Sequence, residues 1–116
     1  MTQILDIQKS IIAANGNTSL AKELFTMLLD DLDQRLEQIE ISFKEKNLEA
    51  LAEHAHKLHG ATAYCVVPNL REYAKTLEYS LKEKTQPNLT ELVENVLSEM
   101  LVIIKEGPAL LKQKWN

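Results

Sequence analysis

Cysteine, glycine, proline and aromatic residues are all scarce in this chain of 116 residues. It has one cysteine, three glycines and three prolines, and aromatic side chains make up 5% of it. A single cysteine, Cys65, excludes an internal disulfide and fits a reducing compartment, so we expect a cytoplasmic location. The few glycines and prolines leave few positions at which a helix must break.

Long apolar runs and an excess of basic charge are also missing. No run of about 18 apolar residues occurs, and the first residues lack the basic and apolar segments of a signal peptide. If the chain belongs to an inner-membrane parent protein, the spans of that parent lie outside this sequence. Lys and Arg number 13 against 17 Asp and Glu, a net charge of −4, which argues against nucleic acid or direct membrane contact.

The remaining composition is typical of a globular protein. Hydrophobic residues make up 45% of the chain and charged residues 26%. The length suits one core, so we expect residues 1–116 to form a single domain.

Apolar residues recur at steps of three and four in five segments, which predicts helices. Four of these segments are long and joined by short loops. They favour an all-α fold, an up-down antiparallel four-helix bundle with an additional short N-terminal helix. By their apolar positions, the segments cover residues 4–11, 20–43, 48–65, 70–81 and 89–104.

Turn formers and capping residues separate the predicted helices. Residues 15–19 combine turn formers with N-cap candidates, and residues 66–67 should end the third helix before Pro68 begins the fourth. Asn88, three residues before a glutamate, resembles a capping box at the start of the fifth helix. We expect Gly107 and Pro108 to stop or kink that helix.

All three histidines of the chain lie close together in the third predicted helix. At 100° per residue, His56 points about 135° away from the apolar stripe, so it should face solvent. His54 lies about 65° to one side of the stripe and His59 about 75° to the other. The histidines therefore do not form a single cluster.

Small residues surround His56 on the predicted helix surface. Its neighbours four residues before and four and seven residues after are Ala52, Gly60 and Ala63. Glycine within a helix costs about 1 kcal/mol relative to alanine, and it often marks the close approach of another body. Gly60 points away from the apolar stripe, which favours approach by a partner over packing within the bundle.

Residues 56–60, His-Lys-Leu-His-Gly, resemble the His-x-Leu-Lys-Gly motif of histidine-containing phosphotransfer (HPt) domains. Most of the chain is similar to the C-terminal HPt domain of BarA/GacS-type hybrid sensor kinases, more loosely after about residue 82. The similarity includes residues 4–6, 15–16, 27–30, 57–64 and 67–68. His59 stands where the family often has lysine, a replacement that BarA-like proteins share, and Val66 stands where it often has glycine.

The resemblance implies a bacterial phosphorelay intermediate with His56 as the phosphoacceptor. A receiver domain would donate the phosphoryl group from its aspartate and supply Mg²⁺, and His56 would pass the group to a response regulator. Lys57 and protonated His59 would stabilise phosphoryl charge, and Ala52, Gly60 and Ala63 would leave room for docking. The resemblance also implies a phosphotransfer domain that has no ATP site and is not itself an enzyme, either free-standing or the C-terminal domain of a hybrid histidine kinase. We expect the isolated domain to be a monomer.

Two other classes of function remain open from the residues. Glu53, His56 and His59 have a spacing that can reach one metal ion, although no further Cys or His completes a typical zinc site. A helical adaptor that binds a partner helix would need an apolar groove and would not need His56.

Overall fold

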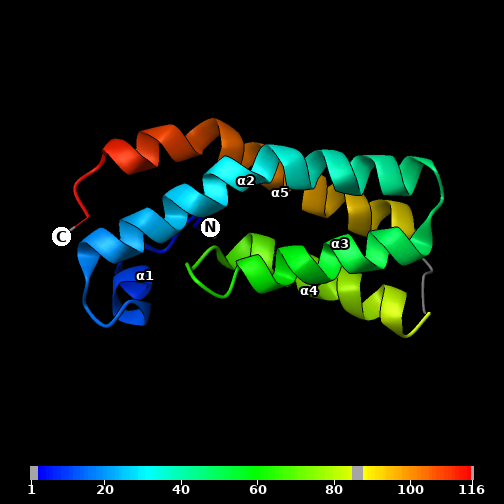
Figure 1. The fold of residues 1–116 in the computed structure, drawn as a ribbon, viewed down its shortest axis with the longest axis horizontal. Coiled ribbons are helices and arrows are strands. Elements are labelled where there is room, and N and C mark those ends of the chain that lie inside the picture. Colours follow the sequence, from blue (N-terminus) through cyan, green and yellow to red (C-terminus); the bar gives the residue numbers. More distant parts are fainter. Residues whose placement is uncertain (1–2, 85–87, 116) are drawn as a thin grey trace.

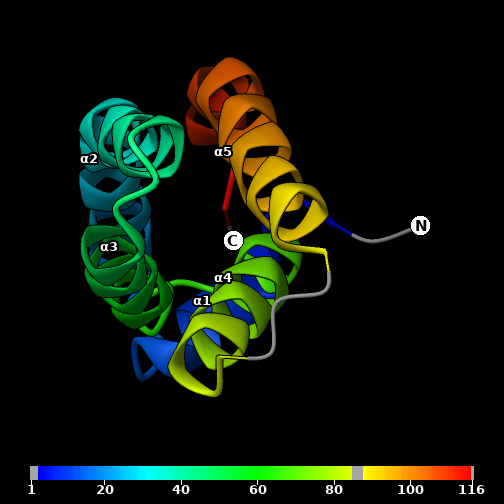
Figure 2. The ribbon, with the colours of Figure 1, turned by 90° about the vertical axis from the view of Figure 1, so that its right-hand side faces the viewer.

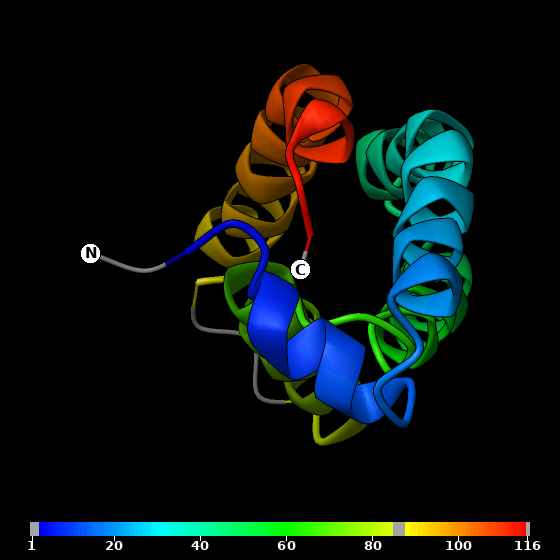
Figure 3. The ribbon, with the colours of Figure 1, turned by 90° about the vertical axis from the view of Figure 1, so that its left-hand side faces the viewer.

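The computed structural model describes residues 3–84 and 88–115. Its five helices are α1 (Ile7–Ala13), α2 (Thr18–Lys44), α3 (Leu48–Ala61), α4 (Pro68–Lys82) and α5 (Leu89–Lys112), and the described residues contain no strand. Helices α2 to α5 alternate in direction (Figure 1) and surround a common centre, with α2 and α3 facing α4 and α5 (Figure 2). The predicted bundle is confirmed, and α1 crosses one end of it (Figure 3).

Side-chain caps or a proline mark the starts of α2, α3 and α4, and those of α2 and α4 were predicted. Asn17 and Asn47 accept hydrogen bonds from the backbone N–H groups of Leu20 and Ala50, at 2.9 and 3.1 Å. Pro68 begins α4, as predicted. The capping box at Asn88 is wrong, because the Asn88 side chain makes no capping hydrogen bond.

One expected helix end differs from the structure, and of the two effects expected at Gly107 and Pro108, a stop or a kink, the stop does not occur. Helix α3 ends at Ala61, before the apolar stripe runs out at Cys65. Helix α5 does not stop at Pro108 but continues to Lys112, although Pro108 has no N–H for the Ile104 carbonyl. The turn after Pro108 is held because Leu110 packs against the core.

Gly107 allows α5 to lie directly against α2. A Cβ atom at Gly107 would fall 2.6 Å from Leu29 Cδ1, so any side chain there would displace Leu29. The C-terminal segment then turns inward between the helices (Figure 3). There Trp115 is buried, as is Phe25 on α2.

Helix α1 fixes the turn that joins α3 to α4. The Asp6 N–H donates to the Val66 carbonyl at 2.8 Å, and the Val66 N–H donates to Ser10 Oγ at 3.0 Å. Cys65 is buried beside this turn, and burial raises the pKa of its thiol to about 11. The two hydrogen bonds therefore anchor Val66, in the turn between α3 and α4, to the N-terminal segment. No helix among the described residues is long and apolar enough to cross a bilayer.

Candidate functional site

His56 lies on the outer face of α3, between positions that anchor the helix to the core. Leu51, Ala55 and Leu58 are fully buried. The side chain of His56 is 74% exposed, which confirms the direction predicted from the helical wheel.

The imidazole of His56 contacts a carboxylate from the neighbouring helix. Its Nδ1 atom lies 2.5 Å from Glu78 Oε2 on α4. The other oxygen of Glu78, Oε1, lies 2.7 Å from His59 Nδ1. One carboxylate therefore joins both histidines across the α3–α4 seam. Glu78 was not predicted from the pattern of residues in the third helix.

Glu78 is ionised in this arrangement. Burial opposes its ionisation, but the hydrogen bonds from His56 and His59 and the charges of these rings outweigh that effect, so the pKa of Glu78 is lowered. An ionised carboxylate only accepts hydrogen bonds, so each Nδ1 must carry a hydrogen. The Nε2 atom of His56 is then the nitrogen left for chemistry, because Nδ1 is occupied.

The small residues predicted around His56 are exposed or half-buried. Ala52 is half-buried, and Gly60 and Ala63 are exposed, the last just beyond the end of α3. A Cβ atom built on Gly60 would meet nothing within 4 Å. Packing within the domain therefore does not require glycine at this position.

The two side chains proposed to stabilise phosphoryl charge have different environments. Lys57 forms an exposed ion pair with Glu53, at 3.1 Å and one turn away. His59 is only 26% exposed and turns toward Glu78. His59 is thus part of the seam, whereas Lys57 lies on the outer surface.

The structure does not support the metal site considered from the sequence. Glu53 is paired with Lys57, and the Nδ1 atoms of His56 and His59 are directed at Glu78. Among residues 3–84 and 88–115, no three His, Cys, Asp or Glu side chains are arranged to hold a metal ion. His54 is half-buried, and its buried Nδ1 has no hydrogen-bond partner in this part of the chain.

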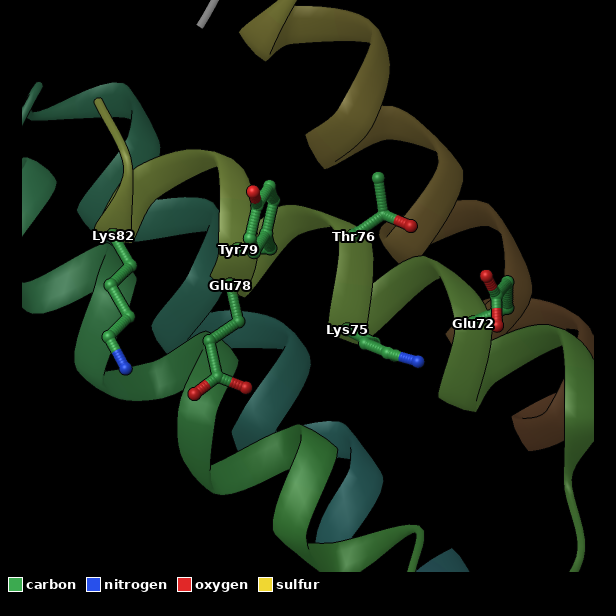
Figure 4. A pocket seen from close by; sticks show the side chains of 6 residues that line it. All are labelled: Glu72, Lys75, Thr76, Glu78, Tyr79 and Lys82. Carbon is green, nitrogen blue, oxygen red and sulfur yellow. The ribbon is translucent and has the colours of Figure 1, made fainter. Parts of the chain in front are cut away.

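A hollow of about 350 Å³ lies on α4 beside Glu78 (Figure 4). Glu78 and Lys82 point toward α3 in this view, whereas Thr76 and Tyr79 point to the other side of α4. Lys75 and Lys82 are about one turn before and after Glu78, so they flank it on one face. The site therefore has cations on α4 that the sequence motif does not contain.

A second, smaller hollow of about 200 Å³ separates α2 from the end of α3. Its exposed apolar members are Met27 and Tyr64, and its charged members, Asp31 and Arg35, pair at 3.9 Å. This surface gives the domain an apolar face close to Ala63, the last of the three small residues predicted around His56.

Comparison with known proteins identifies the family. The family model described as "Hpt domain" matches residues 23–107. The sensor protein GacS of Pseudomonas syringae pv. syringae is 36% identical over 93 residues, which are 80% of this chain and 10% of GacS. The histidine-protein kinase BarA of Escherichia coli K12 is 33% identical over 112 residues, which are 92% of this chain and 12% of BarA.

Solved structures share the fold. The HPT domain of a sensor hybrid histidine kinase from Shewanella superposes with a TM-score of 0.88 and 28% identity, covering 96% of each chain. The phosphotransfer protein HptB of Pseudomonas aeruginosa PAO1 gives a TM-score of 0.79 at 18% identity, covering 98% of this chain and 99% of HptB, and so shows similarity of fold. The chain spans about a tenth of the length of its curated relatives. By its sequence and its fold, the chain belongs to the Hpt domain family.

Proposed function

We propose that His56 Nε2 is the phosphoryl acceptor of this domain. Hpt domains are phosphotransfer modules of two-component phosphorelays, and this chain is a member of that family. The observation that carries the assignment of the atom is the 2.5 Å contact of Nδ1 with Glu78 on a side chain that is 74% exposed. That contact orients the ring and leaves Nε2 for a partner.

The tautomer of His56 determines which ring nitrogen can attack the phosphoryl group. With the hydrogen on Nδ1, the Nε2 lone pair attacks the phosphorus atom of an aspartyl phosphate. The N–P bond forms, the P–O bond to the aspartyl group breaks, and the aspartate leaves as a carboxylate. The Nδ1 hydrogen stays in place, and the positive charge that develops in the ring is stabilised by ionised Glu78.

The donor would be the receiver domain of a hybrid kinase, and the group would then pass to a response regulator. Both would dock over Ala52, Gly60 and Ala63, where small residues leave the acceptor accessible. Mg²⁺ would come with the receiver, because phosphoryl transfer depends mainly on positioning and charge stabilisation. A cytoplasmic setting fits a chain whose one cysteine is free.

The assignment is tested with His56→Gln and the matched control His54→Gln. A phosphorylated receiver domain should label the wild type and His54→Gln with acid-labile phosphate, and His56→Gln should lose labelling at least a hundredfold. His56→Gln should keep the wild-type circular dichroism, because His56 is exposed. The same spectrum is recorded for His54→Gln, because His54 is half-buried. Labelling of His56→Gln at the wild-type rate would refute the assignment.

The adaptor alternative is favoured by one observation, the apolar surface around Met27 and Tyr64. If the domain were a passive adaptor, a receiver would bind His56→Ala normally and no phosphate would transfer to the wild type. Transfer to the wild type rejects that alternative.

A further inference from the structure

A phosphoryl group on His56 brings negative charge to a place that already holds a carboxylate. On a side chain, such a group carries a charge of about −1.5 to −2 at pH 7. On Nε2 it would lie one imidazole ring away from Glu78, which is ionised and contacts Nδ1 at 2.5 Å. A cation beside the ring would offset the repulsion between the two groups.

The basic side chains of α3 near His56 have other partners. Lys57 pairs with Glu53 on the outer surface at 3.1 Å. His59, at the position where the family motif often has lysine, turns its Nδ1 toward Glu78 at 2.7 Å. The side chain at position 59 therefore contacts the carboxylate and not a group on the outer face of His56.

Lys82 on α4 is a cation without such a partner. It lies one turn after Glu78, and Figure 4 shows both side chains directed toward α3. Neighbours one turn apart have Cβ atoms about 5 to 6 Å apart, and lysine is longer than glutamate, so the ammonium group can reach the ring that Glu78 contacts. Among residues 3–84 and 88–115, Lys82 forms no ion pair, and both oxygens of Glu78 contact the histidines.

A small residue on α3 leaves space beside Lys82. Ala52 and Lys82 are each four residues farther from the α3–α4 turn than the contacting pair His56 and Glu78, so they lie at the same level of the hairpin. Ala52 is half-buried and its side chain ends at Cβ, so it fills little of the space between Lys82 and His56.

Lys75 has the same charge and also lies about one turn from Glu78, but its surroundings differ. It is at the level of His59, whose half-buried ring occupies the seam there. Figure 4 shows the Lys75 side chain extending away from Glu78. Lys75 is therefore a matched control for Lys82.

We infer that Lys82 contacts and stabilises the phosphoryl group on His56 Nε2, in place of the lysine that the motif often has at position 59. The inference rests on the proposed role of His56 as acceptor.

The other charges near Lys82 are on the same two helices. Glu83 is the C-cap of α4, Lys84 lies beyond it, and Glu72 is at the other end of the hollow. Glu49 is exposed in the first turn of α3. None of these groups changes in the variants that test Lys82, so their effects cancel in the comparison.

The test is the equilibrium constant for phosphoryl exchange between a phosphorylated receiver domain and this domain. It is measured from the labelled fractions of both proteins, approached from either phosphorylated partner. Lys82→Gln should lower the constant by roughly three- to tenfold, because it removes one charge beside the phosphorylated ring at a partly solvated site. Lys82→Arg, which keeps the charge, and Lys75→Gln should both stay within about twofold of the wild type.

The equilibrium constant separates stabilisation of the phosphoryl group from other roles of Lys82. The constant depends on the free proteins and not on their complex, so a residue that only aids docking changes the rates and leaves it unchanged. Lys82 also lies in the last turn of α4, where a cation favours the helix dipole. That effect is present in both forms of the domain and cancels.

An unchanged constant in Lys82→Gln would overturn the inference. So would an equal fall in Lys75→Gln, which would indicate an effect of net charge alone. His56→Gln in the same assay separates the two proposals. If it were labelled normally, the acceptor assignment would fall and the role of Lys82 with it. If it stayed unlabelled while Lys82→Gln kept the wild-type constant, only the role of Lys82 would fall.

Discussion

The indole ring of Trp115 packs against the phenyl ring of Phe25, with ring centroids 6.1 Å apart and planes inclined by 43°. The indole N–H donates to the Leu110 carbonyl at 3.0 Å, and Trp115 is 2% exposed. The C-terminal segment is thereby part of the core formed by α2 and α5.

We expect Trp115→Ala to lower the free energy of unfolding by about 3 to 5 kcal/mol, because it leaves a cavity beside Phe25. Trp115→Phe should cost less, because it keeps the aromatic contact and loses only the hydrogen bond and some volume. Urea titration followed by circular dichroism measures both. A loss below 1 kcal/mol in Trp115→Ala would show that the segment contributes little to stability.

The contact of Gly107 with Leu29 predicts opposite effects of one substitution in two backgrounds. In the wild type, Gly107→Ala should destabilise the domain by about 1 to 3 kcal/mol, since the added methyl group displaces Leu29. In a Leu29→Ala background the same change should stabilise it by up to about 1 kcal/mol, through helix propensity. Equal effects in both backgrounds, measured by chemical denaturation, would contradict the close contact.

A larger side chain at Gly60 should raise the stability of the domain but slow phosphoryl transfer. Gly60→Leu meets nothing within the domain and improves helix propensity, so we expect a gain of about 0.5 to 1 kcal/mol. The same side chain should block a docking partner and slow labelling at least tenfold. Gly60→Ala should share the stability gain and retain most of the rate. The position would have no docking role if Gly60→Leu accepted phosphate as fast as the wild type.

Buried Glu99 predicts a pH-dependent gain in stability. Glu99 is 9% exposed, and its Oε2 has no hydrogen-bond partner in the described part of the chain. Burial raises its pKa, although a hydrogen bond from Asn69 opposes the shift. A carboxyl group with a raised pKa in the folded state destabilises the fold above that pKa, and the cost disappears as pH falls.

We therefore expect Glu99→Gln to raise the free energy of unfolding by a few tenths to about 1 kcal/mol at pH 7. The gain should shrink as the pH approaches 4, where the wild-type carboxyl group is protonated. Thermal unfolding at several pH values gives the comparison, and a gain that persisted unchanged at low pH would show that charge is not its cause.

The helical wheel predicted His56 correctly but not its partner. Periodicity within α3 determines which side chains are exposed, because the core lies on one side of the helix. It contains no information on contacts with another helix. One signal for Glu78 was present: positions 56 and 78 lie at equal sequence separation from Val67 in the α3–α4 hairpin. The carboxylate of Glu78, next to buried Leu77, could therefore be expected to face His56.

Helix ends predicted from local sequence were wrong where tertiary contacts determine them. Pro108 did not end α5, because the following turn is held by packing of Leu110 and by Trp115. Asn88 stands at the N-cap of α5 without using its side chain, so packing rather than capping determines where that helix starts.

The contact between His56 and Glu78 makes the regiochemistry of phosphorylation a property of the folded state. The two residues belong to different helices and are 22 residues apart, so the unfolded chain has no contact that holds the hydrogen on Nδ1. A small phosphoryl donor should modify the folded domain at one ring nitrogen and the denatured chain at both. The ratio of the two phosphohistidine isomers at position 56 would then report how much of the α3–α4 hairpin is formed.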